Sequence, residues 1–364
     1  MMKTPRQVDI AITHKCNLRC RYCSHFSGAG DVGKDLAPDE WIQFFEELGE
    51  GAVLQVSLQG GEPFFRDDLE EIIEGIVRNR MRFNILSNGT LVTEEKAAFL
   101  AETGRCEEVQ ISIDGSEPVT HDSFRGEGTF NRAVKGIRFL QDQGIEVSVR
   151  VTIHRRNVHA LESIACFLLE DIGLKGFSTN AASYMGLCRF NHDLVRLTTD
   201  ERAIAMEALL RLNRKYNGRI SASAGPLAEA AMWRAMVTAA DRGEAAPPLG
   251  GFLSGCSGPM LKLAVRADGV MVPCIQLGHL ELGRINRNSL EDTWLNHPEL
   301  IRLRHRNRTG LDEFDFCEGC RYLKYCTGNC PALAFLIVGS DHHPSPDACL
   351  KRFLDAGGVL PDVG

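Results

Sequence analysis

The sequence has no uninterrupted apolar run of about 18 residues, so we expect no membrane-spanning segment. It also has no excess of basic residues, because 41 Lys and Arg face 48 Asp and Glu, for a net charge of −7. That balance leaves no electrostatic footprint for nucleic acid. Internal repeats and low-complexity blocks are absent too. An apolar segment begins at residue 8, so no signal peptide is expected before it.

Cysteine, in contrast, is abundant, with 13 in a chain of 364 residues. Without an export signal, this number points to a reducing, cytoplasmic compartment. There, clustered cysteines hold metal more often than they form disulfides. The chain is long enough for one large domain or two, with a buried core.

Three of the cysteines, Cys16, Cys20 and Cys23, directly follow the apolar segment 8–13. Their gaps of three and two residues differ from the paired spacing of most zinc sites, although structural zinc or plain core cysteines are alternatives. Three thiolates supply one ligand fewer than a cubane iron–sulfur cluster normally has. The spacing therefore favours a cluster with one iron left free to bind a small molecule.

Residues 7–182 alternate between strand-like and helix-like segments. We expect strands at 8–13, 53–59, 83–87, 109–113, 147–153 and 177–182, with amphipathic helices between them. Strands that alternate with helices predict βαβ units and a parallel sheet. The predicted fold class is therefore α/β, a partial (β/α)6 TIM barrel that is open at one side. Further helices are expected near 198–213 and 227–242.

Four regions are expected along the chain. Residues 1–215 would form the barrel, and residues 216–255 a helical linker rich in Gly and Pro. Residues 256–350 would form a C-terminal cysteine-rich extension, and residues 351–364 a loose tail.

Polar residues follow the strands of the predicted barrel. A Gly-Gly-Glu turn (60–62) follows the second strand, Asn88 follows the third, and Ser112 and Asp114 lie at the end of the fourth. Because the carboxyl ends of parallel strands meet at one edge, we expect these groups to lie near the three cysteines. Glycines there let the backbone approach a ligand closely.

The cysteine triplet, the glycine turn and the fourth strand together resemble radical S-adenosylmethionine (SAM) enzymes in their order and separation. The resemblance implies that Cys16, Cys20 and Cys23 hold a [4Fe–4S] cluster whose open iron binds SAM. Reductive cleavage would then give a 5′-deoxyadenosyl radical that abstracts a hydrogen from the substrate. The residues that the resemblance implies for SAM binding are Tyr22, Gly60, Gly61, Glu62, Asn88, Ser112, Asp114, Arg125 and Arg150. Surface salt bridges are an equal alternative for the two arginines.

Seven more cysteines occupy the C-terminal region, in an order that resembles the SPASM extension of radical SAM maturases. That extension holds two auxiliary [4Fe–4S] clusters, whereas zinc is the alternative for a single pair of cysteines. By the resemblance, the ligands of one cluster are Cys317, Cys320, Cys326 and Cys349, and those of the other are Cys256, Cys274 and Cys330. The second set is one cysteine short, which implies an open iron or a ligand other than cysteine.

The remaining cysteines are less informative. Cys188 follows the sixth strand and could donate a hydrogen atom, as in radical peptide epimerases, although a structural role is the alternative. Cys106 and Cys166 are expected to serve packing. Cys274 is followed by Ile275 and Gln276, neither of which can act as a base, so sulfatase maturation is not expected.

Three functions are compatible with these motifs. The first is a peptide maturase that modifies a ribosomally made substrate, similar to enzymes of SynChlorMet-type cassettes. It would use a separate leader-recognition protein, because no leader-binding domain is expected before the barrel, and a ferredoxin or flavodoxin as reductant. The second is an enzyme acting on a small molecule, such as a haem precursor or an aminoglycoside. The third is an iron–sulfur electron carrier, which the ligand motifs at the strand ends disfavour.

Overall fold

The computed structural model describes residues 2–25 and 34–361. Within these residues, ten strands form one continuous sheet in the order β10-β9-β8-β1-β2-β3-β4-β5-β6-β7. Neighbours from β1 to β7 are parallel, β8 is parallel to β1, and β8–β9 and β9–β10 are antiparallel. The strands are β1 (Gln7–Thr13), β2 (Gln55–Gly60), β3 (Arg82–Ser87), β4 (Cys106–Ser112), β5 (Val147–Ile153), β6 (Phe177–Ala181), β7 (Ile220–Ala222), β8 (Lys262–Val265), β9 (Val270–Val272) and β10 (Gly283–Arg284).

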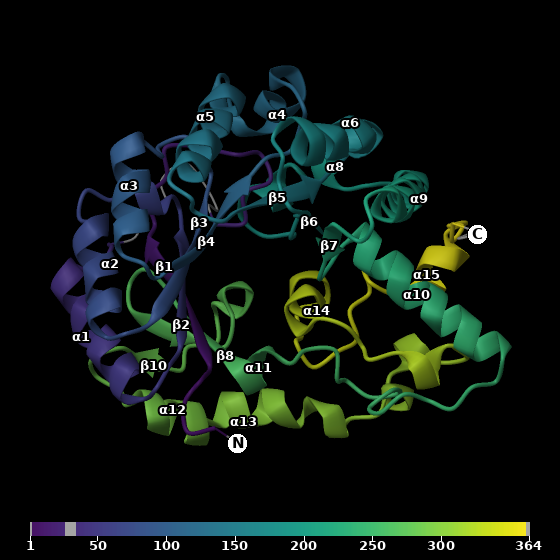
Figure 1. Cartoon of the computed structure of the whole chain (residues 1–364). Coiled ribbons are helices and arrows are strands. Elements are labelled where there is room, and N and C mark those ends of the chain that lie inside the picture. Colours follow the sequence, from purple (N-terminus) through teal and green to yellow (C-terminus); the bar gives the residue numbers. More distant parts are fainter. Residues whose placement is uncertain (1, 26–33, 362–364) are drawn as a thin grey trace.

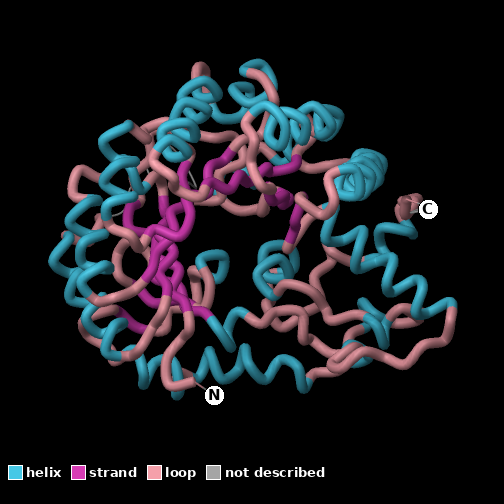
Figure 2. Tube along the Cα trace, viewed as in Figure 1, coloured by secondary structure: helices cyan, strands magenta, loops and turns pink. Residues whose placement is uncertain are grey.

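The parallel strands curve into an arc with helices along its outer face (Figures 1 and 2). Buried residues form continuous runs in β1, β2 and β4 and recur at alternate positions in β3 and β5. The helices of the barrel are α1 (Pro38–Glu50), α2 (Leu69–Arg78), α3 (Glu94–Glu102), α4 (Pro118–Arg125), α5 (Thr129–Asp142), α6 (Leu161–Cys166), α7 (Gly186–Phe190), α8 (His192–Val195), α9 (Thr199–Lys215) and α10 (Pro226–Asp241). Those of the C-terminal part are α11 (Gly258–Leu261), α12 (Leu290–Asn296), α13 (Pro298–Arg304), α14 (Pro331–Val338) and α15 (Leu350–Asp355).

Local sequence signals explain where two of the barrel helices begin. The Thr93 side chain accepts a hydrogen bond from the backbone N–H of Lys96 at the start of α3. Thr198 caps α9 through a reciprocal pair of hydrogen bonds with Glu201. Side-chain oxygens thus satisfy backbone N–H groups that have no partner within the helix.

The expected partial barrel is confirmed, with all six predicted strands present as β1 to β6. Four strands were not predicted: β8, β9 and β10 lie within the cysteine-rich range 256–350, and β7 spans only three residues inside the range 216–255 that was expected to be a helical linker. Strand β7 closes the barrel side of the sheet. It pairs with β6 and extends the sheet. The expected tail, 351–364, begins within helix α15, whose Phe353 packs against Trp233 of α10 with ring centroids 4.9 Å apart. Burial of these two rings orders that segment.

The C-terminal part joins the barrel through the sheet itself. Strand β8 pairs with β1 from Gln7 opposite Lys262 to Ile10 opposite Val265. Trp294 of α12 is fully buried, and its indole N–H donates to the carbonyl of Met2 at 3.1 Å. Elements α14 and α15 lie on the open side of the arc (Figure 1). Within the described ranges, no helix combines the length and the apolar character needed to cross a bilayer.

Candidate active site

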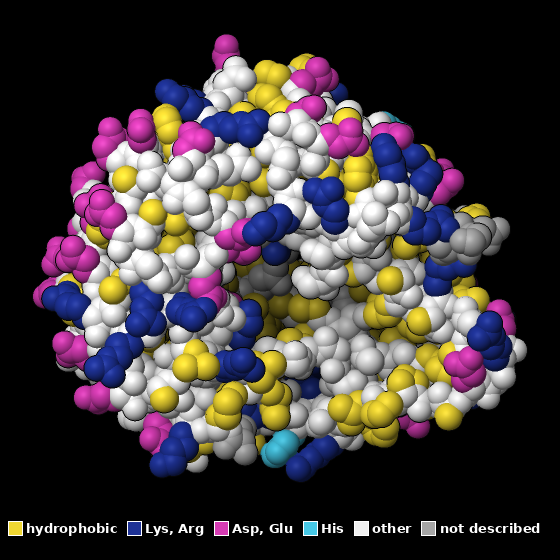
Figure 3. Space-filling view, viewed as in Figure 1, with side chains coloured by type: hydrophobic (Ala, Val, Ile, Leu, Met, Phe, Trp, Pro, Cys, Tyr) yellow, Lys and Arg dark blue, Asp and Glu magenta, His cyan; other side chains and the backbone are white. Residues whose placement is uncertain are grey.

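A pocket of about 300 Å³ lies at the carboxyl ends of the barrel strands. Cys16, Cys20 and Cys23, from the loop after β1, line one side of it. Its other walls come from the ends of β2 to β6. The space-filling view shows a hollow in the middle of one face of the molecule, with Lys and Arg side chains near its rim (Figure 3). Of the polar strand-end groups that the sequence analysis singled out, this lining places Gly60, Gly61, Asn88 and Ser112 beside the three cysteines.

Hydrogen-bond donors point at two of the three sulfurs. The Cys16 Sγ accepts from the backbone N–H of Leu18 at 3.4 Å and from the Asn88 side-chain amide at 3.8 Å. The Cys20 Sγ accepts from the guanidinium of Arg125 at 3.9 Å. Burial raises the pKa of Cys16 to about 12 and that of Cys20 to about 11. These thiols therefore stay protonated at neutral pH unless a metal displaces the proton.

The two glycines of the turn after β2 hold the cysteine loop in place. An added Cβ on Gly60, where φ is +136°, would lie 2.4 Å from the carbonyl oxygen of Thr13, and one on Gly61 would lie 2.0 Å from that of Lys15. The Gly61 N–H donates to the Thr13 carbonyl, and the Glu62 N–H donates to the Lys15 carbonyl, both at 2.8 Å. The absent side chains allow close contact with the chain that enters the cysteine loop, as well as with the pocket.

The Glu62 carboxylate is fully buried behind the pocket wall. It accepts hydrogen bonds from the backbone N–H of Asn88 at 2.7 Å, the hydroxyl of Ser87 at 2.8 Å and the backbone N–H of Phe64 at 3.1 Å. Burial raises its pKa to about 6, against the opposing effect of these hydrogen bonds. Glu62 thus fixes Asn88, whose side-chain amide reaches Cys16.

The Asp114 carboxylate is the centre of a second buried network. It accepts from Arg125 Nε at 2.6 Å, from the backbone N–H of Thr152 at 2.9 Å, and from the hydroxyl of Tyr22. Burial opposes ionisation, but the charge of Arg125 lowers the pKa of Asp114 overall. Burial lowers the pKa of the nearby His154 to about 4, so that its ring is neutral at physiological pH. The network therefore holds Arg125 beside Cys20.

The residues expected to bind SAM divide into two groups. Tyr22, Gly60, Gly61, Asn88, Ser112 and Arg125 line the pocket, whereas Glu62, Asp114 and Arg150 do not. Arg150 lies opposite Ser112 in the β4–β5 register, and its Nε is buried without a hydrogen-bond partner among the described residues. The geometry gives Glu62 and Asp114 a positioning role, because their carboxylates are occupied by neighbouring groups of the protein.

The structure brings the C-terminal cysteines together in the same two groups that the sequence analysis expected. One group consists of Cys256, Cys274 and Cys330. Burial raises the pKa of the Cys256 and Cys274 thiols, and the nearby Cys330 raises both further. In the other group, burial raises the pKa of Cys317 to about 12, and Cys320, Cys326 and Cys349 add to that shift. The four cysteines of this second group are half-buried.

Comparisons with known proteins agree with this arrangement. Residues 10–168 match the radical SAM superfamily, and residues 256–321 match SPASM, an iron–sulfur cluster-binding domain. The chain belongs to the radical SAM superfamily. It is a radical SAM/SPASM enzyme whose cofactors are [4Fe–4S] clusters and SAM.

Two curated relatives illustrate the range of this enzyme family. The AdoMet-dependent heme synthase of Nitratidesulfovibrio vulgaris is 28% identical, with an alignment that covers 93% of this chain and 90% of that protein. The PqqA peptide cyclase of Bradyrhizobium diazoefficiens is 34% identical over 161 residues, which are 44% of this chain and 42% of the cyclase. Among solved structures, SuiB of Streptococcus suis bound to S-adenosylmethionine has the same fold, with a TM-score of 0.71 at 16% identity, covering 96% of this chain and 78% of SuiB.

The residues of the radical SAM pocket fit a cluster. The donor set is three sulfurs on one wall of a hollow, with N–H groups directed at two of them. Within residues 2–25 and 34–361, no three His, Cys, Asp or Glu side chains converge closely enough to hold a single metal ion. A cubane does not require such convergence, because each cysteine binds a different iron of the cluster.

Sequence reasoning missed several pocket residues, among them Thr152, Asn180, Ser183 and Gln276. Thr152 and Asn180 lie near the carboxyl ends of β5 and β6, so the strand-end rule could have found them. The side-chain oxygen of Asn180 is buried without a hydrogen-bond partner in the described chain. Gln276 belongs to the SPASM region and donates to the Ser183 hydroxyl at 2.7 Å, a contact that no local sequence pattern signals.

Cys188 does not line the radical SAM pocket. It is fully buried in an apolar cluster with Phe124 and Val195, and burial raises its pKa to about 11. Its backbone N–H contacts the carbonyl of Cys23 at 3.4 Å. This burial among apolar neighbours favours the structural role of Cys188 over the hydrogen-atom donation that the sequence also allowed.

Proposed function

We propose that this enzyme oxidises a peptide by radical SAM chemistry at the pocket formed by Cys16, Cys20 and Cys23. The observation that carries the proposal is the pocket itself, where a cysteine triplet faces the carboxyl ends of five other barrel strands. The similarity to a peptide cyclase over 161 residues supports a peptide as substrate. A leader-recognition protein and a ferredoxin or flavodoxin would be its partners.

The chemistry supplied by the bound cluster and SAM is reductive cleavage, which yields a radical able to remove hydrogen from an unactivated carbon. Cys16, Cys20 and Cys23 would hold the cluster. Gly60 and Gly61 would present backbone groups to SAM, and Arg125 would neutralise negative charge beside Cys20. Buried strand residues around the pocket would exclude water from the reacting atoms.

The SPASM cysteines would hold two auxiliary clusters. Cys317, Cys320, Cys326 and Cys349 would bind one, and Cys256, Cys274 and Cys330 would bind the other with one iron lacking a cysteine. Removal of an electron from the substrate by way of these clusters would complete a net oxidation.

A second candidate substrate is a tetrapyrrole. The heme synthase supports it, because that similarity extends over 93% of this chain, whereas the 34% identity to the peptide cyclase is confined to 44% of it. Both candidates use the same SAM pocket and differ in what enters it.

The test is mass spectrometry of small peptides encoded next to the gene, each coexpressed with the wild-type enzyme and with the Cys16→Ala/Cys20→Ala/Cys23→Ala variant. Loss of two hydrogens that depends on the three cysteines would support peptide oxidation. An unchanged mass with deuterium gained from heavy water would indicate epimerisation instead. Unmodified peptides, together with conversion of an added iron coproporphyrin, would favour the second candidate.

A further inference from the structure

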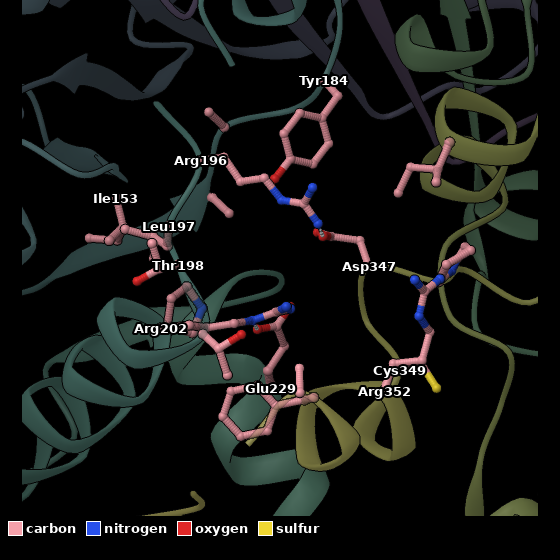
Figure 4. Close-up of a pocket in the computed structure, with 18 of the residues that line it drawn as sticks. Ile153, Tyr184, Arg196, Leu197, Thr198, Arg202, Glu229, Asp347, Cys349 and Arg352 are labelled. Atoms are coloured by element: carbon pink, nitrogen blue, oxygen red, sulfur yellow. Dashed lines mark hydrogen bonds and ion pairs between the residues drawn. The ribbon is translucent and has the colours of Figure 1, made fainter. Parts of the chain in front are cut away.

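A second cavity, of about 180 Å³, adjoins the radical SAM pocket. Ala181 and Ala182, at the end of β6, line both spaces, so the two lie on either side of one chain segment. The far wall of the second cavity comes from the C-terminal segment, including Cys349 and Arg352 (Figure 4). The cavity therefore lies between the SAM pocket and one group of SPASM cysteines.

One pair of charged residues in this cavity is structural. Arg202 of α9 and Glu229 of α10 form a two-point ion pair, with Arg202 Nε 2.7 Å from Glu229 Oε2. The guanidinium also lies over the ring of Trp233, 5.0 Å from its centroid. Both side chains are largely buried. Because each is saturated by the other, neither is available to a ligand.

Arg196 is held much more loosely. Its only acidic contact in the described chain is one Nη2–Oδ1 approach of 3.5 Å to Asp347, and its side chain is 58% exposed. The guanidinium lies 5.5 Å from the ring centroid of Tyr184, whose hydroxyl has no hydrogen-bond partner among the residues described. Tyr184, Arg196 and Asp347 point toward one another in Figure 4. A ligand with better geometry can replace so long a contact.

Arg352 approaches from the opposite wall. It has no acidic partner within residues 2–25 and 34–361, and its guanidinium lies 5.9 Å from the ring centroid of Phe316. Three arginines and two carboxylates line the cavity, so that one positive charge is in excess. Arg202 and Glu229 neutralise each other, so the excess belongs to the part of the lining that Arg196, Asp347 and Arg352 supply (Figure 4).

We propose that this cavity binds a carboxylate of the substrate between Arg196 and Arg352, and thereby orients the substrate toward the SAM pocket. The inference rests on the proposed function, since it assumes a substrate in the adjoining pocket. A cavity of this size is too small for a whole drug-sized ligand. The rest of the substrate would therefore lie outside this cavity, on the side of Ala181 and Ala182, which also border the SAM pocket.

The carboxylate has two possible sources, an acidic residue of a peptide or a propionate of a tetrapyrrole. The experiment uses matched probes for each. One pair is acetylated, amidated Ala-Ala-Glu-Ala-Ala and Ala-Ala-Gln-Ala-Ala, and the other is coproporphyrin III and its methyl ester. Dissociation constants are measured by calorimetry for the reconstituted full chain with SAM bound.

The variants are Arg196→Gln and Arg352→Gln, and the matched control is Arg242→Gln. Arg242 is 71% exposed and lies outside the cavity lining, so it reports only the loss of one positive charge. A charge-assisted hydrogen bond corresponds to a preference of about 10- to 100-fold for the acidic probe. We expect that preference in the wild-type enzyme and in Arg242→Gln, and its loss in both cavity variants.

The outcomes separate this inference from the proposed function. Equal affinity for the acidic and neutral members of both pairs, or a preference that survives both cavity substitutions, would overturn the carboxylate site. Peptide binding without preference would overturn the site while leaving peptide oxidation intact. An arginine-dependent preference for coproporphyrin III alone would support the site and count against a peptide substrate.

Discussion

The most direct test of the cysteine loop is to replace Gly61 by Ala. Its φ lies outside the left-handed region, so Ala adds only steric bulk. The added Cβ would lie 2.0 Å from the carbonyl oxygen of Lys15, against 3.4 Å for an ordinary contact. The chain that enters the cysteine loop must therefore move by about 1.4 Å, the difference between these two distances.

That movement breaks the two backbone hydrogen bonds that Gly61 and Glu62 donate to Thr13 and Lys15. Overpacking costs about 1–3 kcal/mol, and each hydrogen bond contributes about 1 kcal/mol. Together these effects destabilise the cluster-binding conformation of the cysteine loop by about 3–5 kcal/mol. This corresponds to a loss of a hundredfold or more in cluster affinity.

The assay is iron and sulfide content after anaerobic reconstitution, together with 5′-deoxyadenosine formation under dithionite. We expect Gly61→Ala to lose the iron of one cluster and nearly all SAM cleavage, while it keeps the iron of the SPASM region. Gly49→Ala is the matched control. Gly49 lies in α1, away from the pocket, and its added Cβ would lie 3.1 Å from the side chain of Asn79. Full iron content and wild-type cleavage in Gly61→Ala would refute the reasoning.

Three further predictions concern carboxylates that accept hydrogen bonds within the protein, and each is measured by the midpoint of urea unfolding. Asp114→Asn removes the charge that compensates the buried Arg125, so we expect a loss of about 3–5 kcal/mol, and a loss below 1 kcal/mol would contradict it. Although burial opposes it, hydrogen bonds from His14 and Thr13 lower the pKa of Asp35 to about 2 from 3.8. Asp35 therefore stabilises the fold above pH 4, and this contribution of about 2 kcal/mol is lost as pH falls toward 2. In Asp35→Asn, the free energy of unfolding should depend less on pH between 4 and 2. The same pH dependence in the variant and the wild-type enzyme would speak against this role. Burial raises the pKa of Glu62 to about 6 from 4.5, so the free energy of unfolding should fall as pH rises from 4.5 to 6. Glu62→Gln should abolish this fall. A fall of the same size in the variant would show that Glu62 does not cause it.

Much of the barrel could be predicted because its signals are local. Strands β1, β2 and β4 contain runs of buried residues, β3 and β5 alternate between more and less buried residues, and Thr93 and Thr198 mark helix starts. Strand β7 has three residues, too few for a period to show. The pairing of β8 with β1 joins residues more than 250 positions apart, and only the tertiary structure specifies it.

The same distinction applies to the site. Residues such as Asn88 and Ser112 were found because parallel strands deliver their ends to one edge. The carboxylates of Glu62 and Asp114 were expected at the pocket but lie outside its lining, because sequence position does not specify which way a side chain turns beyond a strand end. Gln276 was missed because it belongs to the SPASM region and reaches the pocket only through its side chain, which donates to Ser183 of the barrel.

The shared sheet has a mechanical consequence. Strand β1 leads directly into the cysteine loop, and β8, its hydrogen-bonded neighbour, lies between Cys256 and Cys274 in the chain. A hinge motion between the two iron-binding halves would have to break the backbone hydrogen bonds between β1 and β8. Spacing between their metal centres is consequently set by a single rigid scaffold, so electrons would travel a fixed distance and entry of substrate would depend on side chains and loops.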